Sequence, residues 1–220
     1  MKATGGTMGA RVARASQSVA TMLLVVSAAV VVYAAAMNIR DSRGRVRDIA
    51  GWEELARTGH VLDATTHPVR IVVFTDYQCE ACGTMHQLLA DLRGLHPDRV
   101  WLAVHHYPMD LVHEYAVSAA LAASCAAKQG RFAAMNDLLH LKREQLGVRP
   151  WEAFAREASV PSIDHFEQCI SSPRALEEVR ADSDIAKRLG LAGTPAVIVE
   201  GKLFYGPEAL GYASNLLGRR

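Results

Sequence analysis

The amino-acid sequence predicts an α/β fold in which a long run of helices is inserted into a β-sheet, preceded by an N-terminal transmembrane helix. Runs rich in β-branched residues at 69–75 and 196–199 are typical of buried strands. Between them, residues 111–189 repeat apolar side chains at helical spacing and are divided by glycines and prolines, which end helices. Residues 19–37 carry no charged side chain, which predicts the preceding helix.

The N-terminal region divides into three segments. Residues 19–37, rich in valine and alanine, are long enough to cross a bilayer as a signal anchor. Residues 1–18 would then be a cytoplasmic segment, and residues 38–51, which are charged and aperiodic, a tether. A signal peptide cleaved near alanines 34–36 is the alternative.

Residues 52–220 are expected to form one folded domain. Its elements follow the apolar periodicity, and Pro161 and Pro173 are expected to begin helices because their fixed φ suits a first turn. In chain order, we expect a helix at 52–55, a connection at 59–68, a strand at 69–75, a helix at 79–93, a strand at 100–105, helices at 111–129, 131–146, 151–158, 163–170 and 174–189, strands at 196–199 and 202–205, and a last helix from 208.

The composition limits the classes of function. Half of the 220 residues are hydrophobic, and the formal net charge is +1 at pH 7. No basic stripe is interleaved with aromatic residues, so the sequence argues against nucleic acid as a partner. Neither a P-loop nor a GxGxxG motif is present, so no nucleotide cofactor is expected.

The most informative motif is Cys79-Glu80-Ala81-Cys82, directly after the strand expected at 69–75. Cys79 would stand at the start of the next helix, where unpaired N–H groups and the helix dipole favour a thiolate. Two intervening residues allow the sulfurs to form a small, reducible ring. We therefore expect Cys79 and Cys82 to be a catalytic redox pair.

A zinc site is the main alternative for this motif. It is disfavoured because no second CxxC or HxxxH pair follows at the usual spacing, and Cys125 and Cys169 stand apart. Dithiol–disulfide chemistry needs no metal and no organic cofactor, and we expect neither. The histidines at 86, 105, 106 and 113 are expected to complete hydrogen bonds rather than catalyse.

Four short stretches carry a resemblance to a known family: residues 72–79 with Cys82, 105–108, 126–132, and 189–195, which ends in Gly193-Thr194-Pro195. In this order they resemble the DsbA-like thioredoxin-fold thiol–disulfide oxidoreductases over roughly 52–206. The resemblance implies a thioredoxin fold with a helical insertion at about 111–172 that covers the active site.

The resemblance also implies roles for four further residues. Pro195 would be a cis-proline facing the cysteines, and Thr194 would offer its backbone to an extended substrate peptide; a trans-proline that begins a strand is the alternative. Cys125 and Cys169 would form a structural disulfide, and two buried free thiols are the alternative.

Two positions depart from the family. Val73 stands where the family often has a buried glutamate that accepts protons, and the nearest acid, Asp76, is expected at the exposed end of the strand as a cap. Glu80 and Ala81 are expected to tune the redox pair, because a carboxylate beside a thiolate opposes the helix dipole. This leaves the direction of electron flow open between a milder oxidant and a reductant.

We expect an enzyme, a thiol–disulfide oxidoreductase that acts as an oxidant on exported cysteine-containing proteins. Four cysteines behind an export-like segment favour an oxidising compartment, although the basic residues around residues 19–37 weakly oppose this orientation. We expect a single-pass protein of the cytoplasmic membrane whose catalytic domain faces the periplasm or cell exterior, reoxidised by a quinone-linked membrane partner. The alternatives are a reductase or isomerase for cytochrome or copper-site maturation, and a non-catalytic peptide-binding module.

Overall fold

The computed structural model describes residues 22, 24–34, 46–63 and 69–219. The chain divides into two units, residues 1–44 and 45–220. The described residues of the first unit are helical and exposed. Within the described ranges, no helix combines the length and the apolar character that crossing a membrane requires. The predicted anchor at 19–37 extends beyond the described residues at both ends, and the segment 1–18 lies outside them.

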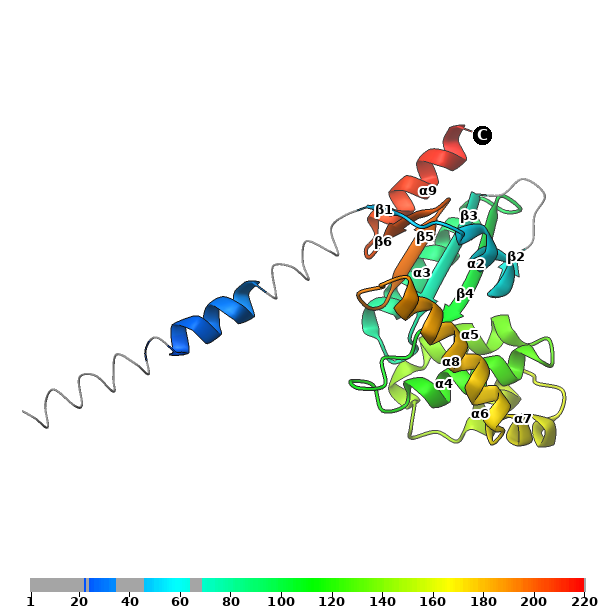
Figure 1. The fold of residues 1–220 in the computed structure, drawn as a ribbon. Coiled ribbons are helices and arrows are strands. Elements are labelled where there is room, and N and C mark those ends of the chain that lie inside the picture. The colour runs from blue at the N-terminus through cyan, green and yellow to red at the C-terminus, as the bar shows by residue number, and fades with distance from the viewer. Residues whose placement is uncertain (1–21, 23, 35–45, 64–68, 220) are drawn as a thin grey trace, which may run out of the picture. The chain divides into compact units, whose positions relative to one another are not determined.

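The second unit is built on one mixed sheet, whose strand order within the described residues is β1-β6-β5-β3-β4-β2 (Figure 1). Strands β3 and β4 are parallel, and the other neighbouring pairs are antiparallel. The strands are β1 (Arg47–Asp48), β2 (His60–Asp63), β3 (Val69–Thr75), β4 (Val100–His106), β5 (Ala196–Val199) and β6 (Lys202–Phe204).

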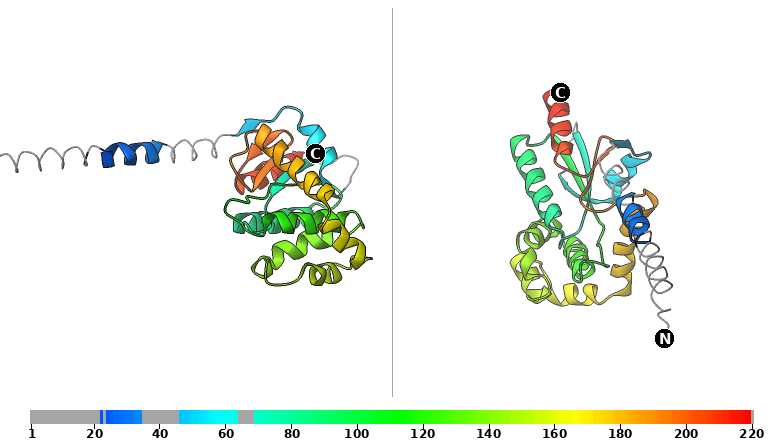
Figure 2. Two further views of the ribbon diagram at one scale, coloured as in Figure 1. Left: turned by 60° about the horizontal axis from the view of Figure 1, so that its bottom comes forward. Right: turned by 90° about the vertical axis from the view of Figure 1, so that its left-hand side faces the viewer.

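Helices cover both faces of this sheet (Figure 2). Because successive side chains of β3 point to opposite faces, Ile71 and Val73 pack toward one layer and Val72 and Phe74 toward the other. The first layer is formed by α3 (Glu80–Leu95) and α9 (Glu208–Arg219), and the second by α2 (Trp52–Thr58) and α8 (Pro173–Arg188). Burial on both faces explains the uninterrupted apolar run of β3.

The helical insertion lies at the end of the sheet where β3 and β4 terminate (Figure 1). It contains α4 (Ala116–Ala127), α5 (Phe132–Leu141), a 3₁₀ turn (Arg143–Gln145), α6 (Trp151–Glu157) and α7 (Ile163–Ile170). A disulfide between Cys125 and Cys169, with a Cα–Cα distance of 5.7 Å, joins α4 to α7. The insertion therefore covers the C-terminal ends of the two central parallel strands.

The structure corrects four of the predicted boundaries. The connection predicted at 59–68 contains β2, an edge strand that pairs with β4. The folded unit begins before residue 52, because β1 pairs with β6 and Ile49 is buried, so the end of the predicted tether is part of the fold. Residues 111–115 are a turn rather than helix, and Ser162, not Pro161, directly precedes α7 and caps it.

Candidate active site

The two cysteines of the CxxC motif lie at the junction between β3 and α3. Cys79 is the N-terminal cap of α3, and its backbone N–H donates to the carbonyl oxygen of Asp76 at 3.2 Å. Cys82 lies in the first turn, with its N–H donating to the Cys79 carbonyl at 3.1 Å. Both are free thiols; Cys79 is half-buried, whereas Cys82 is only 1% exposed. Incoming thiols can therefore reach Cys79 much more easily than Cys82.

The environments of the two sulfurs separate their acidities. Hydrogen bonds from the side chain and backbone of Cys82, and then from the side chain of Thr194, lower the pKa of Cys79 to about 6 despite partial burial. Burial raises the pKa of Cys82 above that of a free cysteine, and the neighbouring Cys79 sulfur raises it further. Near neutral pH the arrangement therefore provides one thiolate, on the accessible sulfur.

The Thr194–Pro195 peptide bond is cis and lies beside the motif. The antiparallel register of β3 and β5, which places Phe74 opposite Ala196, brings the start of β5 to the end of β3. As a result, the Cys79 thiol donates to the carbonyl oxygen of Thr194 across 3.6 Å. Thr194 is partly exposed, so its backbone can be reached by an extended peptide.

Asp76 is not at an exposed strand end as predicted, because it is 1% exposed. Its Oδ1 accepts from the Gln78 N–H at 2.8 Å, and its Oδ2 accepts from the Met109 N–H at 2.7 Å and contacts His113 Nδ1 at 2.8 Å. Gln78 in turn accepts from the Tyr115 N–H. These bonds tie the turn before Cys79 to the loop after β4, and they hold residues 111–115 out of the predicted helix.

Glu80 and Ala81 both lie on the surface at the start of α3. The groups that set the pKa of Cys79 include the buried carboxylate of Asp76, which opposes the thiolate. Because water screens an exposed charge, Glu80 is expected to raise the pKa of Cys79 less than the sequence suggested. Its tuning role remains a prediction.

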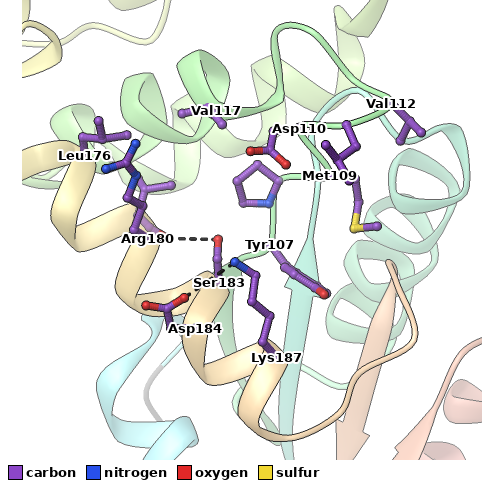
Figure 3. A pocket seen from close by; sticks show the side chains of 13 residues that line it. Tyr107, Met109, Asp110, Val112, Val117, Leu176, Arg180, Ser183, Asp184 and Lys187 are labelled. Atoms are coloured by element: carbon purple, nitrogen blue, oxygen red, sulfur yellow. Dashed lines mark hydrogen bonds and ion pairs between the residues drawn. The ribbon is translucent and has the colours of Figure 1, made fainter.

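A groove of about 440 Å³ runs between the loop after β4 and α8. Leu176 and Val117 line one end, and Met109 and Val112 lie toward the other (Figure 3). The side chain of Leu111, also in this lining, is 96% exposed. The sequence did not predict this groove. Its two walls, residues 107–117 and 176–187, lie far apart in the chain, with the helices of the insertion between them.

The histidines and the possible metal ligands can be placed in the structure. His105 is buried and hydrogen-bonded, with Nδ1 2.7 Å from Asp182 Oδ1 and Nε2 2.9 Å from the Leu55 carbonyl oxygen, which is a structural role. Within the part of the chain that the structure describes, no three His, Cys, Asp or Glu side chains are grouped as metal ligands.

Comparison with known proteins agrees with this geometry. The family model described as thioredoxin matches residues 56–217. The chain is 32% identical over 161 residues to a Na⁺/H⁺ antiporter NhaA 3 of Salinispora tropica, covering 70% of this chain but 24% of the relative. It thus spans about a quarter of the length of the curated relatives it matches.

Solved structures share the fold. A thioredoxin-like oxidoreductase from Silicibacter pomeroyi superposes with a TM-score of 0.63 at 24% identity, over 78% of this chain and 99% of its own. The thiol–disulfide exchange protein α-DsbA2 from Wolbachia pipientis gives a TM-score of 0.65 at 15% identity, over 76% of this chain and 93% of its own. The fold is therefore the α/β fold with a helical insertion that the sequence predicted.

Proposed function

Because the chain belongs to the thioredoxin family, we propose that it is a thiol–disulfide oxidoreductase in which Cys79 and Cys82 form the redox pair. The observation that carries this proposal is the unequal environment of the two sulfurs. Cys79 is accessible and has a pKa of about 6, whereas the Cys82 thiol is buried with a raised pKa. Only a pair arranged in this way gives one sulfur for exchange with a partner and a second for closing the ring.

In the oxidising direction, a substrate thiolate attacks Cys79 Sγ of the Cys79–Cys82 disulfide. A substrate–Cys79 bond forms, the bond to Cys82 breaks, and Cys82 leaves with the electron pair and takes up a proton. A second substrate thiolate then attacks the substrate sulfur, and Cys79 leaves as a thiolate. The substrate loses two electrons, which the Cys79–Cys82 pair gains.

The direction of transfer is inferred from the acidity of Cys79. A thiolate that its surroundings stabilise favours the reduced form of the pair, and a pair with a stable reduced form is a strong oxidant. The pKa of about 6 at Cys79 supports oxidation of substrates over their reduction. A reductase in metal-site maturation would need a more stable disulfide.

The substrate is proposed to be an extended peptide segment of an exported protein that contains cysteines. The backbone of Thr194, 3.6 Å from the Cys79 sulfur, would pair with this segment in a β-like contact. The groove along α8, whose lining is mostly apolar but includes charged residues such as Arg180 and Lys187, would receive neighbouring side chains of the substrate.

The cellular setting is part of the same proposal. The uncharged segment at 19–37 supports a single membrane anchor. The four cysteines behind it support a folded unit outside the cytoplasm. The chain matches part of proteins that are named as Na⁺/H⁺ antiporters, which supports a location at a membrane. A membrane partner linked to the quinone pool would then accept the two electrons and restore the disulfide.

The test is disulfide transfer to a peptide with two thiols. Oxidised protein is mixed with the reduced peptide, and the peptide disulfide is quantified by mass spectrometry for the wild type, Cys79→Ser and the double variant Cys125→Ala/Cys169→Ala. Transfer by the wild type and the double variant, but not by Cys79→Ser, is expected. Transfer that survives Cys79→Ser, or no transfer by the wild type, would contradict the proposal.

A further inference from the structure

A small cavity is lined by Cys82. Its volume is about 10 Å³, which is the least space that accommodates one water molecule. Most of its wall is apolar and includes Val73, but four polar side chains also line it. These four are Thr75, His86, Asn136 and His140, and Cys82 lines the cavity with them. The polar side chains come from β3, α3 and α5, so only the folded structure brings them together.

His86 connects this cavity to the surface. It lies four residues after Cys82 on α3, so the two side chains share a helix face. Its Nδ1 is 3.4 Å from Asn136 Nδ2, on the side of the cavity, whereas its Nε2 is 3.1 Å from Asp137 Oδ1. The His86 side chain is 17% exposed and that of Asp137 is 63% exposed. The ring therefore has one nitrogen toward the cavity wall and the other toward solvent.

Neighbouring groups fix the orientation of this ring. The Tyr77 hydroxyl donates to Asn136 Oδ1 at 3.1 Å, so the Asn136 amide nitrogen is the atom that faces His86. Donation from that nitrogen to Nδ1 leaves the neutral ring with its proton on Nε2, facing Asp137. The ring of His140 stacks on that of His86 with centroids 4.6 Å apart.

His140 and Thr75 complete the polar wall of the cavity. Thr75 Oγ1 lies 3.4 Å from His140 Nε2, and among the described residues His140 Nδ1 has no hydrogen-bond partner. Burial holds the pKa of His140 well below that of a free histidine, so its ring stays neutral. It can hold a water molecule in place but cannot store the proton.

The chemistry at Cys82 needs a path for a proton. The buried thiol must lose its proton before it can attack, and the thiolate must regain one after it has left. Val73 has no group that can accept it, although it lines the same cavity. We propose that His86, through a single water molecule in the cavity, carries this proton between Cys82 and the surface at Asp137. This inference rests on the proposed function and identifies how the buried Cys82 sulfur gains and loses its proton.

The proton transfer begins from a mixed disulfide between Cys79 and a substrate. The Cys82 proton passes to the cavity water. The water replaces the Asn136 amide, which is 3.4 Å away, as the partner of His86 Nδ1 and passes a proton to that nitrogen. The Nε2 proton of His86 leaves to Asp137 and solvent. The Cys82 electron pair then forms the bond to Cys79 Sγ, and the substrate sulfur leaves with the electron pair of the broken bond. In the oxidising direction, the same path runs in reverse.

Other charged and titratable groups also surround this path. Asp76 and Cys79 act on Cys82, and His106 acts on His140. His86 is faced from α5 by Asp137 and His140. His86 is not among the groups that set the pKa of Cys79, which include Cys82, Thr194 and Asp76. Substitution of His86 should therefore change proton transfer at Cys82 without changing the pKa of Cys79.

The test measures how fast Cys82 resolves a mixed disulfide. Cys79 is first coupled to a chromogenic aromatic thiol, and release of that thiol is followed by stopped flow across a range of pH. The variants are His86→Gln and Asp137→Asn, and the matched control is His165→Gln, an exposed histidine on α7. Thermal unfolding and the alkylation rate of Cys79 are recorded for every variant.

At neutral pH, His86→Gln should slow release about tenfold or more, a loss typical of general acid–base groups. Asp137→Asn should slow it less, His165→Gln should match the wild type, and all rates should converge in alkaline buffer. Equal rates for His86→Gln and the wild type at neutral pH, or a slowing that is the same at every pH, would overturn the inference. Failure of the wild type to release the thiol at all would overturn the proposed function as well.

Discussion

The sulfur of Cys79 lies 3.6 Å from the carbonyl oxygen of Thr194, although the two residues are 115 positions apart. The contact follows from the antiparallel pairing of β3 and β5, which places the loop before β5 at the start of α3. A peptide that pairs with the Thr194 backbone would therefore bring its own cysteine to Cys79. In the proposed function, substrate binding and chemistry would therefore depend on the same pair of strands, β3 and β5.

The first prediction concerns which thiol reacts. Alkylation of the reduced protein with iodoacetamide should modify Cys79 long before Cys82, with a rate that rises with pH through about 6, because the thiolate is the nucleophile. Cys82→Ser should accumulate mixed disulfides at Cys79, because the resolving sulfur is gone. Peptide mapping that finds Cys82 modified first would reverse the roles of the two residues.

The second prediction concerns the stability of the reduced protein. The pKa of Cys79 is about 6 in the folded state, against 9.0 for an ordinary thiol. Between these values the unfolded chain binds more protons than the folded one, so this contribution to the free energy of unfolding should rise with pH. It should be lost as the pH falls through about 6.

Urea unfolding of the reduced wild type and of Cys79→Ser provides the measurement. Subtracting the two removes the titration of the buried histidines, which both proteins share. The difference in the free energy of unfolding should grow from acidic to mildly alkaline pH. Beyond that window, the part of the raised Cys82 pKa that is caused by Cys79 opposes it. A difference that is flat across this window would show that the thiolate is not stabilised by folding.

The third prediction concerns the disulfide that joins α4 to α7. The bond spans 44 residues, and in the chain-entropy model its loss destabilises by about 4 kcal/mol. The double variant Cys125→Ala/Cys169→Ala should therefore melt at a lower temperature but exchange disulfides at nearly the wild-type rate. Loss of exchange with no loss of stability would instead mean that this pair relays electrons.

The fourth prediction concerns Glu80. Glu80 follows Cys79 in the chain but is exposed, so Glu80→Gln should lower the pKa of Cys79 only slightly. The pH dependence of Cys79 alkylation measures this effect, with Glu177→Gln, at an exposed position of α8, as the control. A large fall would restore Glu80 as the main tuning group, and a rise would show that its charge does not act on the thiolate.

Local patterns in the sequence were sufficient to predict the junction of β3 and α3. There a β-branched run changes directly into helical periodicity, and the cysteines lie at the change. Strand β2 was missed because it is a short edge strand, and its polar ends, His60 and Asp63, hide its pairing with β4. Sequence periodicity reports burial on a face, not backbone pairing at an edge.

The polar surroundings of the site could not be predicted in the same way. Asp76 looked like the exposed end of a strand, but Met109 and His113, more than thirty positions later, bury it and bond to it. Likewise, His86 and His140 come from separate helices and meet only because α5 packs against α3. Such contacts depend on tertiary packing, of which a single sequence gives no local signal.

The reduction potential of the Cys79–Cys82 pair tests the central claim most directly. It is measured by equilibrating the protein in glutathione buffers of known composition, trapping the thiols and counting them by mass. With the pKa of Cys79 held at about 6, we predict a reversible two-electron couple with a potential well above that of thioredoxin, which is about −270 mV. A potential at or below that of thioredoxin would contradict an oxidant, and the absence of a reversible disulfide between these two residues would contradict the account as a whole.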